Sequence, residues 1–132
     1  MRSALPSTLR ILALACIAPA LFHVAFGVSG DWLIGLDPAS PIDPSLYSQN
    51  RFYGAAFSLY GVLLWMCAGD LSRYRPMLTA ALAVMFASGC ARALAVFVHG
   101  WPSWQVMGLW SSEVIVPLLI WLWVKRFADE QR

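Results

Sequence analysis

Residues 77–98 read MLTAALAVMFASGCARALAVFV, a run that contains a single charged side chain, that of Arg92. At 1.5 Å per residue, an α-helix of this length can cross the roughly 30 Å of hydrocarbon in a bilayer. Three similar runs, each of roughly 17 to 22 residues, occupy 9–28, 52–68 and 106–124. We therefore predict one all-α domain over residues 1–132. It is an integral membrane antiparallel four-helix bundle, with helices at about 8–28, 44–68, 77–98 and 104–127.

The composition excludes a soluble domain, because 60% of the residues are hydrophobic and only 12% are charged. A soluble protein of this size cannot bury that much apolar surface. The cysteines Cys16, Cys67 and Cys90 lie within or at the ends of the predicted helices and have no CxxC spacing. Buried free cysteine behaves as a small apolar residue, so we expect no metal and no cofactor.

The positive charges are unevenly distributed, and they predict the orientation. The connections 29–49 and 99–105 contain no lysine or arginine. Apart from Arg51 and Arg92, the basic residues lie in the N-terminus, the 69–76 connection and the C-terminus: Arg2, Arg10, Arg73, Arg75, Lys125, Arg126 and Arg132. By the positive-inside rule, both termini are cytoplasmic. Such sparse basic residues do not indicate nucleic-acid binding. The first apolar run is too long for a signal peptide and lacks a cleavage site, so we expect it to be a span.

The long outer connection contains three acidic residues, and we interpret two of them structurally. Asp43 followed by Pro44 is typical of a helix start, with a capping side chain and proline at the first helical position. Asp37-Pro38 indicates the same device or a turn. The spacing of these residues and Asp31 matches no calcium-binding loop, so no metal is expected here.

Small residues recur at about one-turn intervals in two of the predicted helices. They are Gly54, Ser58 and Gly61 in the second, and Ala83, Ala87 and Ala91 in the third. Such rows let neighbouring membrane helices approach closely.

The ionisable residues of the four spans all fall at similar depth, in the outer half of the membrane. Arg92 lies about 9 Å below the outer end of its helix and Glu113 about 12 Å below the end of the next. Arg51, with Asn50 beside it, and His23 lie near the outer ends of theirs. A lone charge in hydrocarbon costs several kcal/mol. We therefore expect these five residues to form one polar cluster, in which Glu113 contacts Arg92, Arg51 or both.

This cluster has two main interpretations. It is either a buried network that locks the second, third and fourth helices together, or the wall of an outward-facing pocket rimmed by Trp101 and Trp104. Two arginines against one glutamate leave surplus positive charge, and the guanidinium fork suits carboxylate and phosphate. An anionic head group, such as that of a lipid, is then the expected ligand. A proton relay through His23 and Glu113 is a third interpretation.

Four short motifs carry a resemblance to a known family. They are Asn50-Arg51-Phe52 with Gly54, then Gly89-x-x-Arg92, Gly100-x-Pro102, and Glu113 in the fourth helix. In this order, they resemble small bacterial four-helix membrane proteins that are catalogued as domain of unknown function 4345. The resemblance covers 11–124. It implies a bacterial inner-membrane protein without a settled activity, and it assigns no catalytic residue.

The function that we expect is binding of an anionic or lipid-like ligand in an outward-facing polar pocket. Membrane lipid and an anionic small molecule are the expected partners. One alternative is a structural or assembly subunit, within a homo-oligomer or a larger membrane complex. Another is a small membrane enzyme acting on a lipid-like substrate, for which Glu113 and His23 are the only candidate acid–base pair. Four helices without internal repeats do not favour a transporter.

Overall fold

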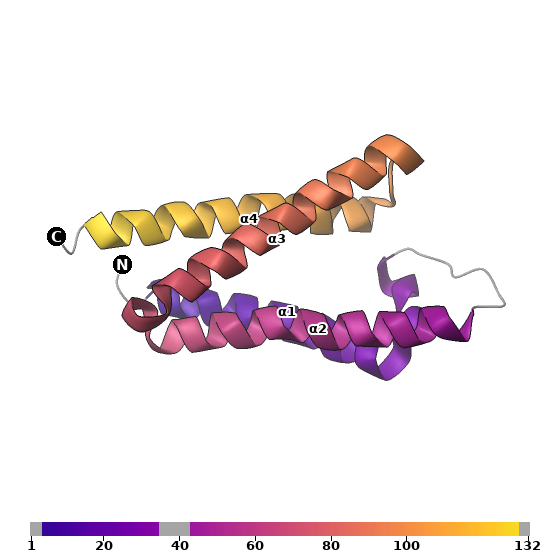
Figure 1. The fold of residues 1–132 in the computed structure, drawn as a ribbon, viewed down its shortest axis with the longest axis horizontal. Helices are drawn as coiled ribbons and strands as arrows, with labels where there is room; N and C mark the ends of the chain where they lie inside the picture. The colour runs from indigo at the N-terminus through magenta and orange to yellow at the C-terminus, as the bar shows by residue number, and fades with distance from the viewer. Residues whose placement is uncertain (1–3, 35–42, 130–132) are drawn as a thin grey trace.

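The computed structural model of the protein describes residues 4–34 and 43–129, and within these it is all-α, with no strand. Four long helices, α1 (Ala4–Phe26), α2 (Pro44–Gly69), α3 (Leu71–His99) and α4 (Trp104–Asp129), make up the fold (Figure 1). A short 3-10 helix, η1 (Gly27–Ile34), follows α1. All four α-helices are long and apolar enough to cross a membrane, which is the pattern of a multi-pass membrane protein. The all-α class and the four long apolar helices are therefore confirmed.

The start of α2 is the one that the sequence predicts. Asp43 is the N-cap and Pro44 occupies the first helical position. The Asp43 carboxylate accepts a 2.8 Å hydrogen bond from the backbone N–H of Ser45. This bond satisfies one of the donors that a helix start leaves unpaired. The Asp37-Pro38 turn lies outside the described residues.

The start of α3 differs from the prediction, because the helix begins at Leu71 and not at Met77. The side chain of Asp70 caps it, accepting a 3.0 Å hydrogen bond from the Arg73 N–H. Pro76 therefore lies inside the helix, where its missing N–H removes a single backbone hydrogen bond. An aspartate immediately before the helix was the sequence signal for the earlier start.

Helices α1 and α2 lie side by side and are in contact through glycines (Figure 1). A Cβ atom on Gly54 would lie 2.9 Å from the Ala20 carbonyl oxygen, and one on Gly61 would lie 2.7 Å from that of Ala13. The backbones thus approach as closely as the small residues of α2 predict. The later glycine of α2, Gly61, contacts the earlier residue of α1, Ala13, so the two helices run in opposite directions.

Helices α3 and α4 form a second pair, and their close contact is at Gly89. A Cβ atom there would lie 2.7 Å from Val114 Cγ2. The predicted row of Ala83, Ala87 and Ala91 is exposed instead. At 100° per residue this row lies roughly on the opposite side of α3 from Gly89, so one helix cannot present both to the same neighbour.

The two pairs meet at one end of the molecule and separate toward the other (Figure 1). We name the first the terminal end, because α1 begins and α4 ends there, and the second the loop end. The shared core lies at the terminal end: Leu5, Leu9, Ala13, Cys16, Leu64, Cys67, Ala68, Leu78, Leu82, Ile120 and Val124. The polar residues that were predicted to cluster therefore lie at the loop end, where no shared core of described residues joins the two helix pairs.

Candidate functional site

The five residues expected to form one cluster divide into two groups, one on each helix pair. Arg92 and Glu113 belong to the α3–α4 polar group, together with Gly89 and Trp110. His23 and Asn50 belong to the α1–α2 polar group, together with Asp31. The structure thus corrects the single-cluster arrangement. Shared depth does not imply contact, because the two helix pairs diverge toward the loop end (Figure 1).

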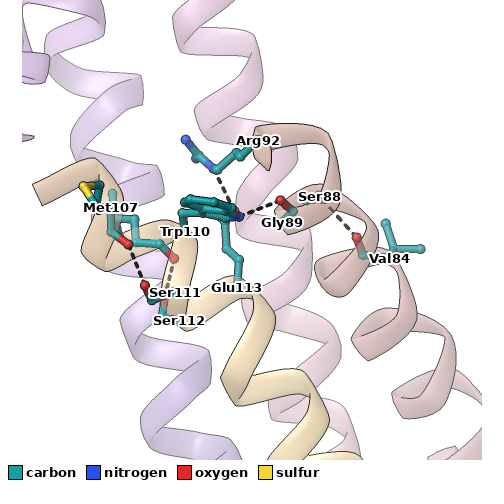
Figure 2. A network of polar contacts seen from close by, with 10 residues as sticks. Val84, Ser88, Gly89, Arg92, Met107, Trp110, Ser111, Ser112 and Glu113 are labelled. Atoms are coloured by element: carbon teal, nitrogen blue, oxygen red, sulfur yellow. Dashed lines mark hydrogen bonds and ion pairs between the residues drawn. The ribbon is translucent and has the colours of Figure 1, made fainter. Parts of the chain in front are cut away.

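The α3–α4 polar group is centred on an ion pair between the two helices (Figure 2). The Nε of Arg92 donates to Oε2 of Glu113 at 2.7 Å, and the side chains are 45% and 14% exposed respectively. The predicted pairing of Glu113 with Arg92 is confirmed. Within the described part of the chain, the two terminal nitrogens of Arg92 have no hydrogen-bond partner. The guanidinium therefore keeps most of its five donors available.

Trp110 makes the second contact between α3 and α4 (Figure 2). Its indole Nε1 donates a 2.8 Å hydrogen bond to the carbonyl oxygen of Gly89. Trp110 was not among the residues that the sequence predicted for the site. A glycine in the middle of a predicted span was the available signal, because it marks a place where another helix comes close.

Nearby hydroxyl groups do not extend this group. Ser88 donates to the Val84 carbonyl at 3.0 Å, and Ser111 donates to that of Met107 at 2.9 Å (Figure 2). Each bond stays within one helix. The hydroxyl groups of these serines therefore donate within their own helices and do not contact Arg92.

The α1–α2 polar group contains Asp31, which the sequence analysis considered only as a metal ligand and did not place in the cluster. Its Oδ1 lies 3.0 Å from His23 Nε2, and its Oδ2 accepts from Asn50 Nδ2 at 3.5 Å. Asp31 reaches His23 because the chain turns sharply at Gly27, whose φ is +58°. Such a backbone angle favours glycine. In the sequence, Gly27 was the signal for a turn that could bring Asp31 beside His23.

Two further features complete this group. The Oδ1 of Asn50 is buried and has no hydrogen-bond partner among the described residues. The hydroxyls of Ser29 and Tyr47 are hydrogen-bonded to each other, which joins η1 to α2.

Arg51 does not join Glu113. Its side chain is exposed, and its Nε lies 3.5 Å from the position that a Cβ on Gly27 would occupy. It makes no ion pair or hydrogen bond with residues 4–34 or 43–129. Each of the two arginines thus belongs to a different helix pair and has donors to spare.

The described residues contain no group of three His, Cys, Asp or Glu side chains that could hold a metal ion. Cys16 and Cys67 are buried, Cys90 is exposed, and all three are free thiols. His23 and Glu113, the candidate acid–base pair, have different partners and do not contact each other.

These features define a class, namely a small all-α protein with four candidate membrane spans and two polar groups at one end. The model of the family described as "Domain of unknown function (DUF4345)" matches residues 7–124. The chain belongs to this family, which confirms the resemblance seen in its motifs. No curated protein and no solved structure matches the chain.

Proposed function

We propose that this protein is a multi-pass protein of the bacterial inner membrane that binds an anionic, lipid-like ligand at its loop end. Its four helices would form an antiparallel membrane bundle with both termini in the cytoplasm and the loop end outside. The distribution of lysine and arginine supports this orientation. The four candidate spans support the membrane location.

The observation that carries the proposal is the state of Arg92. This side chain lies within a candidate span. Only its Nε donates a hydrogen bond to Glu113, and 45% of the side chain is exposed. A guanidinium in the bilayer is costly unless an anion or water satisfies it. Phosphate and carboxylate groups fit its two terminal nitrogens in bidentate geometry.

The surroundings of Arg92 favour an amphiphile over a free anion. Apolar side chains at this end are open to the outside: Leu94 is 66%, Phe97 87%, Trp101 74% and Trp104 78% exposed. An anionic head group on Arg92 would leave its acyl chains against this apolar surface. Arg51, on the other helix pair, makes no ion pair with the described residues and offers a second positive charge at the same end.

The test compares lipid binding by arginine variants of the purified protein in a neutral detergent. Native mass spectrometry would measure binding of phosphatidylglycerol, which is anionic, and of phosphatidylcholine, which is zwitterionic. Arg92→Gln should weaken phosphatidylglycerol binding about tenfold, the factor that one charge-assisted interaction is worth. Phosphatidylcholine binding should not change.

The matched control is Arg75→Gln, which removes the same charge at the terminal end. It reports the general effect of losing one positive charge, and Arg51→Gln reports the share of the second arginine. Melting temperatures would show that each variant is folded. Equal losses of binding in Arg92→Gln and Arg75→Gln would overturn the proposal.

The second candidate function is that of a structural subunit, which would assemble with other membrane helices through α3. It is favoured by the exposed row of Ala83, Ala87 and Ala91, since small residues let another membrane helix come close. Ala87→Leu should then lower the oligomeric state measured by analytical ultracentrifugation in detergent. An unchanged monomer before and after the substitution would remove this candidate.

A further inference from the structure

The ion pair between Arg92 and Glu113 uses one atom of each side chain. The Nε of Arg92 donates to Oε2 of Glu113 at 2.7 Å, and the terminal nitrogens of the guanidinium point away from Glu113 (Figure 2). The other carboxylate oxygen, Oε1, accepts no hydrogen bond from residues 4–34 or 43–129. A carboxylate accepts on both of its oxygens. The pair therefore keeps two unused functions, a donating fork on Arg92 and an accepting oxygen on Glu113.

The Oε1 atom of Glu113 is accessible from outside the fold. Among the described residues, the one buried side-chain nitrogen or oxygen that lacks a partner is Oδ1 of Asn50. Because Oε1 of Glu113 also lacks a partner, it is not a buried atom. The nearest other donor between the two helices, the indole N–H of Trp110, is already bonded to the Gly89 carbonyl oxygen. A bound molecule can therefore supply the donor that Oε1 lacks.

The charge of Glu113 affects which anions Arg92 can bind. Glu113 is the only acidic residue between Leu71 and Ala128, and its carboxylate lies beside the guanidinium that would bind a phosphate. A phosphodiester and a carboxylate repel each other, so an anion without a hydrogen-bond donor gains affinity from Arg92 and loses part of it to Glu113. A head group with an O–H close to its phosphate replaces this repulsion with a charge-assisted hydrogen bond.

We propose that Glu113 is the specificity-determining residue of the α3–α4 polar group, and that it selects a phosphodiester lipid whose head group carries a hydroxyl. The phosphate binds the terminal nitrogens of Arg92, and the hydroxyl donates to Oε1 of Glu113. Phosphatidylglycerol has this chemistry, because its glycerol hydroxyls lie a few bonds from the phosphate. This inference rests on the proposed lipid binding at Arg92 and names the head group that the same site prefers.

The experiment compares two anionic lipids that have the same acyl chains and the same charge. Phosphatidylglycerol is one, and phosphatidylpropanol is the other, since its propyl head group has the carbon skeleton of glycerol but no hydroxyl. Native mass spectrometry of the full chain in a neutral detergent measures the binding of each. The wild type should bind phosphatidylglycerol about tenfold more tightly, the factor that one charge-assisted hydrogen bond is worth.

Variants separate the role of Glu113 from that of Arg92. Glu113→Met removes the accepting oxygen and should bring the ratio of the two affinities close to one. The control Asp43→Asn removes one negative charge from the start of α2 and should keep the tenfold preference. Arg92→Gln should weaken both lipids, because both share the phosphate contact.

The outcomes distinguish this inference from the proposed function. If Arg92→Gln leaves the binding of both lipids unchanged, the site at Arg92 and the selection by Glu113 are both overturned. If Arg92→Gln weakens both lipids but the wild type binds them equally, or Glu113→Met keeps the preference, only the selection by Glu113 is overturned. The wild-type ratio decides the question even if Glu113→Met does not fold.

Discussion

The indole N–H of Trp110 donates a 2.8 Å hydrogen bond to the carbonyl oxygen of Gly89, and this bond crosses from α4 to α3. It forms where the absence of a side chain on Gly89 lets the two backbones approach. Glu113, three residues further along α4, reaches Arg92, three residues further along α3. One close approach therefore aligns both polar contacts of this pair (Figure 2).

Gly89→Ala should separate α3 from α4. The new Cβ would lie 2.7 Å from Val114 Cγ2, and a β-branched side chain within a helix has little rotational freedom to move away. We expect a loss of about 1–3 kcal/mol in unfolding free energy, the usual cost of overpacking. Gly108→Ala is the control, because nothing lies within 4 Å of that position. It should be neutral or stabilising in SDS titrations, and equal effects of the two substitutions would contradict the close approach.

Trp110→Phe should remove the hydrogen bond to Gly89 while keeping an aromatic ring. The carbonyl oxygen retains its bond within α3, so the cost should be about 1 kcal/mol. Trp104→Phe is the matched control, because Trp104 is 78% exposed, and it should be near neutral. The same SDS titrations measure both, and a Trp110→Phe protein as stable as Trp104→Phe would show that the bond adds nothing.

The Arg92–Glu113 pair should show coupling in a double-mutant cycle. Arg92→Gln, Glu113→Gln and the double variant should give a coupling free energy of about 1.5–3 kcal/mol, because either single substitution removes the same charge-assisted hydrogen bond between the two helices. Since Arg51 makes no pair with Glu113, the cycle of Arg51→Gln with Glu113→Gln should show no coupling. Coupling of similar size in both cycles would mean that both arginines share the carboxylate.

Asp43 should make the start of α2 sensitive to acid. The backbone N–H of Ser45 holds the pKa of the Asp43 carboxyl below its ordinary value. A group with a lowered folded-state pKa stabilises the fold above its unfolded pKa, and this contribution is lost as the pH falls through the lowered value. Amide exchange at Ser45 and Leu46 should therefore accelerate in acid.

The control for this cap is Asp43→Asn, which keeps an oxygen acceptor but cannot titrate. Its exchange, corrected for intrinsic rates, should not depend on pH. Asp43→Ala should exchange rapidly at every pH. If the asparagine variant retained the acid sensitivity of the wild type, another group would be responsible.

The proposed orientation predicts where reporters will lie. A reporter fused after Arg132 should behave as cytoplasmic, and one inserted at Ala39, outside the described residues, should behave as external. Paired alkaline phosphatase and green fluorescent protein fusions measure this directly. The reverse result at either site would rule out the orientation.

The sequence predicted the features that depend on neighbouring residues or on the bilayer itself. Residues 77–98 and their three counterparts gave four helices because length and apolar composition suffice for that inference. Asp43 with Pro44 predicted the start of α2, since capping is local. A lone Glu113 in hydrocarbon predicted an arginine partner, because the cost of an unpaired charge applies in any arrangement of helices.

Only the tertiary structure decided which side chains meet. Arg92 pairs with Glu113 and Arg51 does not, because Gly89 brings α3 to α4 while Gly54 and Gly61 bring α2 to α1. Asp31 pairs with His23 because the backbone turns at Gly27. Depth along a helix follows from residue number, but the neighbour at that depth depends on where two backbones can approach, which is a property of the packed pair.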